Sequence, residues 1–131
     1  MTLKYAILVS GSPYSSQAHM SAQRFIYACY QQGHTVNSVF FYGDGVYVAN
    51  QLLSPANDEF QTQREWQQLA NNFKVPLHAC VTVANKRGIL SAEDSELLGQ
   101  NFHNLAKSFE ISGLGSWVTA AATADRQIHF S

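Results

Sequence analysis

Charged residues are scarce in this chain of 131 residues: Asp, Glu, Lys and Arg make up 13% of it, about half the usual share of a globular domain. Its eight basic and nine acidic residues nearly cancel, and no stretch holds more than two adjacent basic residues. Direct binding of nucleic acid needs a basic face that neutralises phosphates. The sequence therefore argues against direct nucleic-acid contact, and it predicts that other subunits cover part of the surface.

Cysteine is rare as well. Cys29 and Cys80 are far apart in the chain and form no CxxC pair, which indicates free thiols in a reducing compartment rather than a disulfide scaffold. The five histidines show no HxH or HExxH spacing, so no metal site is predicted. The loop that starts at Gly11 lacks the GxGxxG and GxxxxGK[ST] patterns, so no nucleotide cofactor is predicted either.

Long apolar runs are missing too. After the first four residues only five apolar residues follow, Tyr5 to Val9. That run is too short for the core of a signal peptide or for a membrane span. We therefore expect a cytoplasmic protein without membrane contact.

The sequence does contain enough apolar residues for a hydrophobic core. Of all residues, 46% are hydrophobic and 12% are aromatic, which excludes a disordered chain. The length fits one domain, residues 1–131. Short apolar segments typical of strands alternate with segments of helical spacing; the expected strands are 3–10, 35–41, 75–83, 108–112 and 127–130. This alternation predicts a single-domain three-layer α/β/α fold with a mainly parallel, about five-stranded sheet.

Four helices are expected between these strands. The first starts near Ala18 and stops at Gly33. The second is predicted to be capped by Asn57 or Asp58 and to carry one apolar stripe, formed by Phe60, Trp66, Leu69, Ala70 and Phe73. The third follows a capping-box-like Ser91-Ala92-Glu93-Asp94 and is expected to present one face of Leu98, Phe102, Leu105 and Phe109. A short fourth helix is expected around Trp117.

Reactive groups of an open parallel sheet gather at the carboxyl ends of the strands. Three segments qualify: the loop Gly11–Gln17, the turn Tyr42–Gly45 and the residues around Cys80. The loop has two interpretations, an ordinary strand-to-helix turn or a cradle of amide groups for an anion. The aromatic residues near the second segment, Phe40, Phe41, Tyr42 and Tyr47, suit a core and a subunit interface better than a ligand pocket.

Cys80 is the strongest candidate for chemistry, because it lies late in the third strand and ahead of Lys86 and Arg87. Helix N-termini and nearby cations favour the nucleophilic thiolate. The alternative is an inert core residue, since free cysteine is often buried. His78 shares a strand face with Cys80, about 7 Å along the strand, and either assists a thiolate or is a partly buried polar residue. Cys29 falls on the apolar stripe of a helix and is interpreted as structural.

Several segments resemble the DsrE-like family of sulfurtransferase subunits. The most specific block is Ser38–Leu52, and the others are Ser54–Phe60, Trp66–Leu69, Leu77–Val81, Arg87-Gly88, Ile111–Gly115 and Asp125-Arg126. The resemblance runs over nearly the whole chain, and the family's reactive cysteine matches Cys80. It also implies a parallel three-layer α/β/α sheet.

The resemblance implies a sulfurtransferase that relays sulfur as a cysteine persulfide, without metal or organic cofactor, in the pathway to 2-thiouridine at the tRNA wobble position. It implies a cytoplasmic heterohexamer with TusB-like and TusC-like subunits, a TusA-like carrier as sulfur donor and a TusE-like acceptor. Lys86, Arg87 and His78 are not assigned by the family.

Three other functions remain open at this point. A DsrE-like subunit of a sulfur-oxidation complex would use the same chemistry in another pathway. A non-catalytic structural subunit would leave Cys80 inert. A small-ligand binding module would use the loop Gly11–Gln17.

Overall fold

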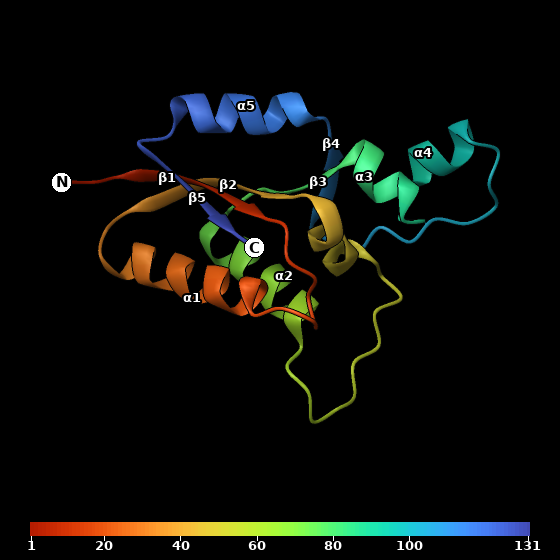
Figure 1. Ribbon diagram of the computed structural model, residues 1–131, viewed down its shortest axis with the longest axis horizontal. Coiled ribbons are helices and arrows are strands. Elements are labelled where there is room, and N and C mark those ends of the chain that lie inside the picture. The colour runs from red at the N-terminus through yellow and green to blue at the C-terminus, as the bar shows by residue number, and fades with distance from the viewer.

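The computed structural model describes residues 1–131. Its central feature is a five-stranded sheet in the order β4-β3-β2-β1-β5, in which all neighbouring strands run parallel (Figure 1). The strands are β1 (Lys4–Val9), β2 (Thr35–Phe41), β3 (Leu77–Cys80), β4 (Phe109–Ser112) and β5 (Arg126–Phe130). The helices are α1 (Ala18–Gln31), the 3-10 helix η1 (Gly43–Ala49), α2 (Thr62–Phe73), α3 (Val81–Lys86), α4 (Ala92–Leu97) and α5 (Leu114–Thr123). The predicted α/β class with a parallel five-stranded sheet is confirmed.

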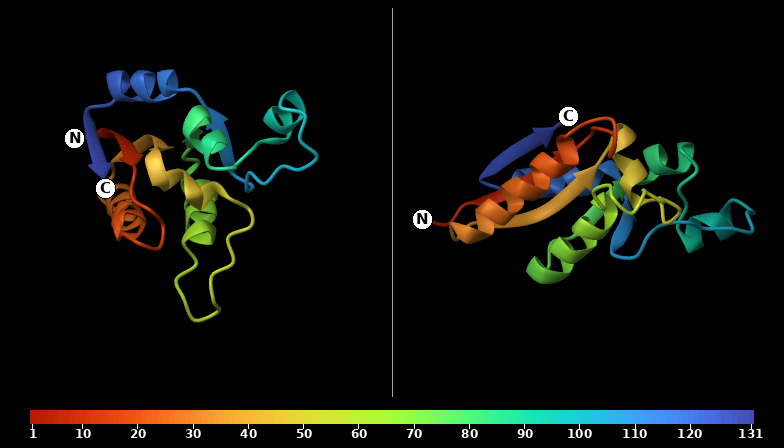
Figure 2. Two further views of the ribbon diagram at one scale, coloured as in Figure 1. Left: turned by 45° about the vertical axis from the view of Figure 1, so that its right-hand side comes forward. Right: turned by 90° about the horizontal axis from the view of Figure 1, so that it is seen from below.

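The sheet is covered on both faces (Figures 1 and 2). Helices α1 and α2 lie on one face, and α5 lies on the other, where it contacts β1 and β2. Alternate strand residues point to the α1/α2 face and form the main core with the two helices. These strand residues include Ile7, Val9, Val39, Phe41 and Leu77, all at most 1% exposed. A strand buried on both faces reads as a continuous apolar run, which explains why β1 and β2 are evident in the sequence.

Helix α1 follows its predicted pattern. Ala22, Ile26 and Cys29 are buried on one stripe, because residues three or four apart share a helix face. The helix ends before Gly33, whose φ of +83° lies in the left-handed region that glycine adopts without a steric penalty.

The third predicted strand is too long. Instead of residues 75–83, β3 covers only Leu77–Cys80, and α3 begins at the next residue. An apolar run cannot distinguish a buried strand from a buried helix, and here Ala84 of α3 is fully buried. Cys80 is therefore the last residue of its strand and the N-cap of a helix.

The predicted start of α2 and the predicted extent of α4 are also wrong. Helix α2 begins at Thr62 after Gln61, not at Asn57 or Asp58, although Trp66 and Leu69 do form its buried stripe. Helix α4 is a helix of six residues that ends at Leu97. Only its start matches the prediction, since the Ser91 hydroxyl accepts a hydrogen bond from the amide of Asp94 at 3.0 Å.

The apolar face expected after Ser91 does not exist. Leu98 and Phe102 lie beyond α4 and are exposed. Phe109 belongs to β4 instead. The spacing of these side chains resembles that of a helix, but the chain leaves the helical conformation after Leu97.

The segment after β2 forms η1 rather than a simple turn. Val46, Val48 and Ala49 of this 3-10 helix are fully buried and join the main core. Phe40 and Phe41 are buried as predicted, while Tyr42 and Tyr47 are partly exposed. The turn between β2 and α2 thus contributes to the core as well as to the surface.

Candidate functional site

The three segments predicted to carry chemistry do lie at the carboxyl edge of the sheet. The loop Gly11–Gln17 follows β1, η1 follows β2, and Cys80 ends β3. Strand β2 separates β1 from β3, so the loop and Cys80 are about 10 Å apart across the sheet. The hollow beside the loop is not lined by Cys80.

Cys80 occupies the junction between β3 and α3. Its φ and ψ of −61° and 124° are extended, and the residue is 5% exposed. It pairs in register with Ser112, the last residue of β4. The thiol belongs to the rim of the sheet rather than to the 21-residue core on the α1/α2 face.

His78 and Cys80 lie on the same face of β3, because residues two apart in a strand point the same way. Leu77 and Ala79 face the opposite side and belong to the main core. Phe40 of β2 and Glu110 of β4 pair in register with His78. Ser112 of β4 pairs in register with Cys80. The α5 face of the sheet therefore carries the polar residues of β3 and β4.

A polar groove of about 570 Å³ lies between α5 and the sheet beside His78. Its walls include Asn37 and Ser38 of β2, and Ser116 and Thr119 of α5. Two buried polar atoms there have no hydrogen-bond partner, Nδ1 of His78 and Oδ1 of Asn37. Buried polar groups normally have a partner in protein or water, so this groove is suited to hold water or another hydrogen-bonding group. Cys80 is not among the residues that line it.

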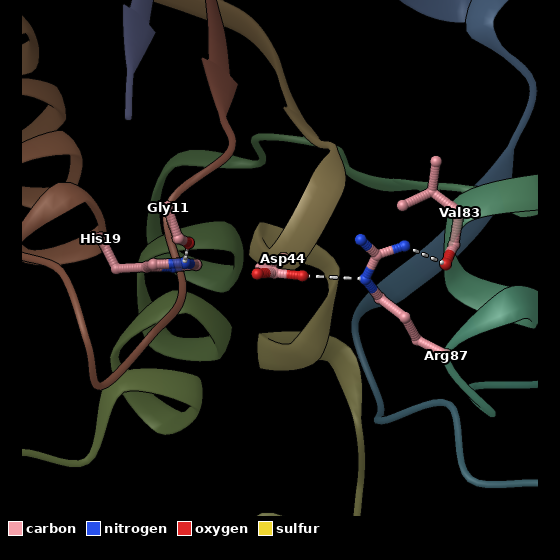
Figure 3. A network of polar contacts seen from close by, with 5 residues as sticks. All are labelled: Gly11, His19, Asp44, Val83 and Arg87. Atoms are coloured by element: carbon pink, nitrogen blue, oxygen red, sulfur yellow. Dashed lines mark hydrogen bonds and ion pairs between the residues drawn. The ribbon is translucent and has the colours of Figure 1, made fainter.

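The two cations considered as helpers of Cys80 lie at the other end of α3. Lys86 is the last residue of this helix, and Arg87 is its C-cap, about 9 Å from the start of α3. Figure 3 shows that the Arg87 guanidinium points to Asp44 of η1: its Nε lies 3.1 Å from Asp44 Oδ1, and Nη1 donates to the Val83 carbonyl at 3.2 Å. Arg87 therefore joins α3 to η1.

Replacing Arg87 with glutamine is expected to have a small effect on stability. The Arg87–Asp44 pair is partly exposed, with 59% of the Asp44 side chain accessible, and exposed pairs contribute about 0–1 kcal/mol. We expect the free energy of unfolding to fall by at most about 1 kcal/mol, measured by urea denaturation. A loss of several kcal/mol would show that the pair is structurally essential.

His19 is a buried histidine that the sequence analysis did not single out. Trp66 Nε1 donates to its Nδ1 at 3.0 Å, so its Nε2 carries the proton and donates to the Gly11 carbonyl at 2.8 Å (Figure 3). The ring also stacks on Phe41, with centroids 5.8 Å apart. Burial lowers the pKa of His19 to about 4, so the ring is neutral and fixes the loop after β1.

Two other candidate positions, Cys29 and the loop Gly11–Gln17, show fewer features of a functional site. Cys29 is a free, buried cysteine, and burial raises the pKa of its thiol. The loop Gly11–Gln17 borders a hollow of about 430 Å³, across which the Tyr14 hydroxyl donates to the Phe60 carbonyl at 2.9 Å.

No three His, Cys, Asp or Glu side chains lie together as a metal site would require. None of the helices is both long and apolar enough to cross a bilayer.

Solved structures share this fold, and two of them are compared with it below. The ychN protein from E. coli superposes with a TM-score of 0.76 at 21% identity, over 98% of this chain and 99% of that one. MTH1491 from Methanobacterium thermoautotrophicum, described as a protein of unknown function, gives a TM-score of 0.64 at 14% identity, over 97% and 98% of the two chains. At these identities the likeness concerns the fold alone.

Curated relatives are considerably more similar. The "Sulfurtransferase TusD homolog" of Vibrio vulnificus strain CMCP6 is 46% identical over 129 residues, 98% of both chains. The "Sulfurtransferase TusD" of Sodalis glossinidius is 44% identical over 99% of this chain and 100% of its own. That of Photorhabdus laumondii is 41% identical over 98% of both.

The family resemblance inferred from the sequence is thereby confirmed. The chain matches the DsrE/DsrF-like family from residue 3 to residue 130, and relatives at 41% to 46% identity extend over nearly its whole length. This protein belongs to the DsrE/DsrF-like family.

Proposed function

We propose that this chain, a sulfurtransferase like its curated relatives, carries sulfur as a persulfide on Cys80. The observation that supports Cys80 is its position: it is the last residue of β3 and the N-cap of α3, at the edge of the sheet. Cys29 lies in the main core on α1 instead. Of the two thiols, Cys80 is the one at the carboxyl edge of the sheet, where the reactive groups of parallel sheets gather.

The reaction is a thiol–persulfide exchange. The Cys80 thiolate attacks the terminal sulfur of a donor persulfide, R–S–SH. A bond forms between Cys80 Sγ and that sulfur, the donor S–S bond breaks, and the donor leaves as a thiolate that takes up the proton lost by Cys80. The products are Cys80–S–SH and R–SH, with no net oxidation. An acceptor thiolate then removes the sulfur in the same way, so no metal or organic cofactor is required.

In the proposed pathway the chain works in the cytoplasm, in the relay to 2-thiouridine in tRNA. Its donor would be a TusA-like carrier and its acceptor a TusE-like protein. The TusD names of the relatives favour this relay over a sulfur-oxidation complex. The near balance of acidic and basic residues agrees with a relay member that leaves tRNA contact to others.

Helix α5 supports the proposed heterohexamer with TusB-like and TusC-like subunits. It contains no charged residue, and none of its residues is buried. Leu114 and Val118 are 51% and 60% exposed. Depletion of charge and exposure of apolar side chains are typical of permanent interfaces. We therefore assign α5 to a contact with another subunit.

Intact-protein mass spectrometry tests the role of Cys80. The chain, assembled with its partner subunits, is incubated with a cysteine desulfurase, cysteine and the TusA-like carrier. We expect a gain of one sulfur mass that a reductant removes, that Cys80→Ser abolishes and that the matched variant Cys29→Ser retains. No gain in the wild-type complex, with the carrier shown to be charged, would make Cys80 an inert residue and the chain a structural subunit.

A further inference from the structure

Residues 89–106, which we name the α4 lobe, project from the body of the molecule (Figures 1 and 2). They follow α3 and return to β4. Three large apolar side chains of the lobe are mostly in solvent: Leu97 is 78% exposed, Leu98 58% and Phe102 56%. Single exposed apolar residues are common, but three on one projecting segment indicate a contact surface.

A buried amide clamps both ends of the lobe to the body. Asn104 is 4% exposed, and its Oδ1 accepts from the Leu90 amide at 2.9 Å. Its Nδ2 donates to the Gly88 carbonyl at 3.0 Å and to Asn50 Oδ1 at 3.1 Å. The base of the lobe is thereby tied to the end of η1.

A second buried polar group organises the tip of the lobe. The Ser95 hydroxyl lies 2.6 Å from the Phe102 carbonyl and 3.3 Å from that of Gln100. These contacts tie α4 to the returning chain, which leaves the Leu97 and Phe102 side chains outside. A surface held in place before binding loses less conformational entropy when a partner docks.

The charge of the lobe distinguishes it from α5. It contains Glu93, Asp94 and Glu96 but no Lys or Arg, so three of the nine acidic residues of the chain lie in one helix of six residues. Charges beside an apolar contact accelerate encounter with a partner of opposite charge. A symmetric contact between two copies of the lobe would instead bring like charges together. The partner that fits is therefore a different protein, with basic side chains around an apolar recess.

The lobe also lies within reach of Cys80. Helix α3 starts directly after Cys80 and is about 9 Å long, and the lobe begins three residues beyond its end. An ordinary interface buries about 800 Å² on each side, roughly 30 Å across. A partner seated on the lobe would therefore extend over the end of β3.

We propose that the α4 lobe is the docking surface for a protein that exchanges sulfur with Cys80 and that presents an apolar recess bordered by Lys and Arg. This inference rests on the proposed function. The lobe binds the partner transiently and brings its persulfide or thiol to the sheet edge, whereas α5 is assigned to a permanent contact.

The test compares a protein donor with a small one. The double variant Glu93→Lys with Glu96→Lys reverses the exposed charge of the lobe, and Leu97→Ser with Leu98→Ser removes apolar surface. The control is a charge reversal outside the lobe, Asp58→Lys, in the exposed segment before α2. Persulfide formation on Cys80 is followed by mass spectrometry with the charged TusA-like carrier and, separately, with inorganic polysulfide. Transfer from loaded Cys80 to the TusE-like acceptor is measured as well.

We expect both lobe variants to lower kcat/KM for exchange with the carrier or the acceptor about tenfold, and the charge variant to flatten its dependence on salt. In both lobe variants, the rate at which polysulfide loads Cys80 and the fraction of assembled complex in native mass spectrometry should stay within about twofold of wild type. The control Asp58→Lys should leave exchange, loading and assembly at their wild-type values. Unchanged exchange with both proteins, equal loss with polysulfide, or loss of assembly would each overturn the proposal. Failure of wild-type Cys80 to load from either donor would instead refute the role of Cys80.

Discussion

Acidification from pH 7 to pH 4 is expected to cost this chain about 3 kcal/mol of stability through His19 alone. The pKa of His19 falls from its ordinary value of 6.5 to about 4 in the folded chain. The unfolded chain therefore takes up the proton first as the pH falls, so stability is full above pH 6.5 and declines toward pH 4. The size of this loss of stability follows because a difference of one pKa unit between the folded and unfolded chain corresponds to about 1.4 kcal/mol.

Urea denaturation at several pH values measures this effect, with His19→Gln as the matched variant. A glutamine can offer an oxygen to Trp66 Nε1 and an amide N–H to the Gly11 carbonyl, but it does not titrate. We expect the pH dependence of the variant to be shallower than that of the wild type by about 3 kcal/mol over this interval. Parallel curves for the two proteins would contradict the assignment, because all other titrating groups are shared.

Replacing Gly45 with alanine is expected to destabilise the fold by about 3 kcal/mol. A Cβ at Gly45 would collide with the carbonyl oxygen of Val9 and lie 3.2 Å from Cα of Ser10. Both obstacles are backbone atoms at the end of β1, where the Tyr42 amide donates to the same Val9 carbonyl at 3.0 Å. The η1 segment would have to move away from the sheet, and part of the core would move with it.

The matched substitution is Gly115→Ala, on α5. A Cβ there meets no atom within 4 Å, and alanine favours a helix over glycine by about 1 kcal/mol. Thermal and urea unfolding should therefore show opposite signs: a large loss for Gly45→Ala and a small gain for Gly115→Ala. A loss below about 1 kcal/mol for Gly45→Ala would show that η1 can move without cost.

The sequence predicted the elements whose residues determine their own conformation. Strand β2 has the predicted bounds, 35–41, because its apolar run is short and ends at glycines. Helix α1 stops where Gly33 permits a left-handed turn. The parallel sheet followed from the alternation of strands and helices. In these cases local pattern and tertiary structure agree.

The parts that could not be predicted depend on distant contacts. His19 obtains its role from Gly11 and Trp66, which lie 8 and 47 positions away. Asn104 clamps the α4 lobe through Asn50, 54 positions away. Because this contact is not visible in the local pattern, the spacing of the apolar residues after Ser91 predicted a core helix instead of a projecting lobe. Cys80 was assigned through the family resemblance, because the same position suits an inert core thiol. No side chain reveals such partners by itself.

The placement of β5 has a consequence for synthesis of the chain. Strand β1 lies between β2 and β5, and the Lys4 amide is held by the Asp125 carboxylate at 2.8 Å, across 121 positions. Until residues 126–130 have left the ribosome, β1 can pair only on its β2 side. Its other side remains an open strand edge, which is prone to pair with other nascent chains. The sheet is therefore complete only once β5 itself has been synthesised, and until then the β1 edge is open to pairing with other chains.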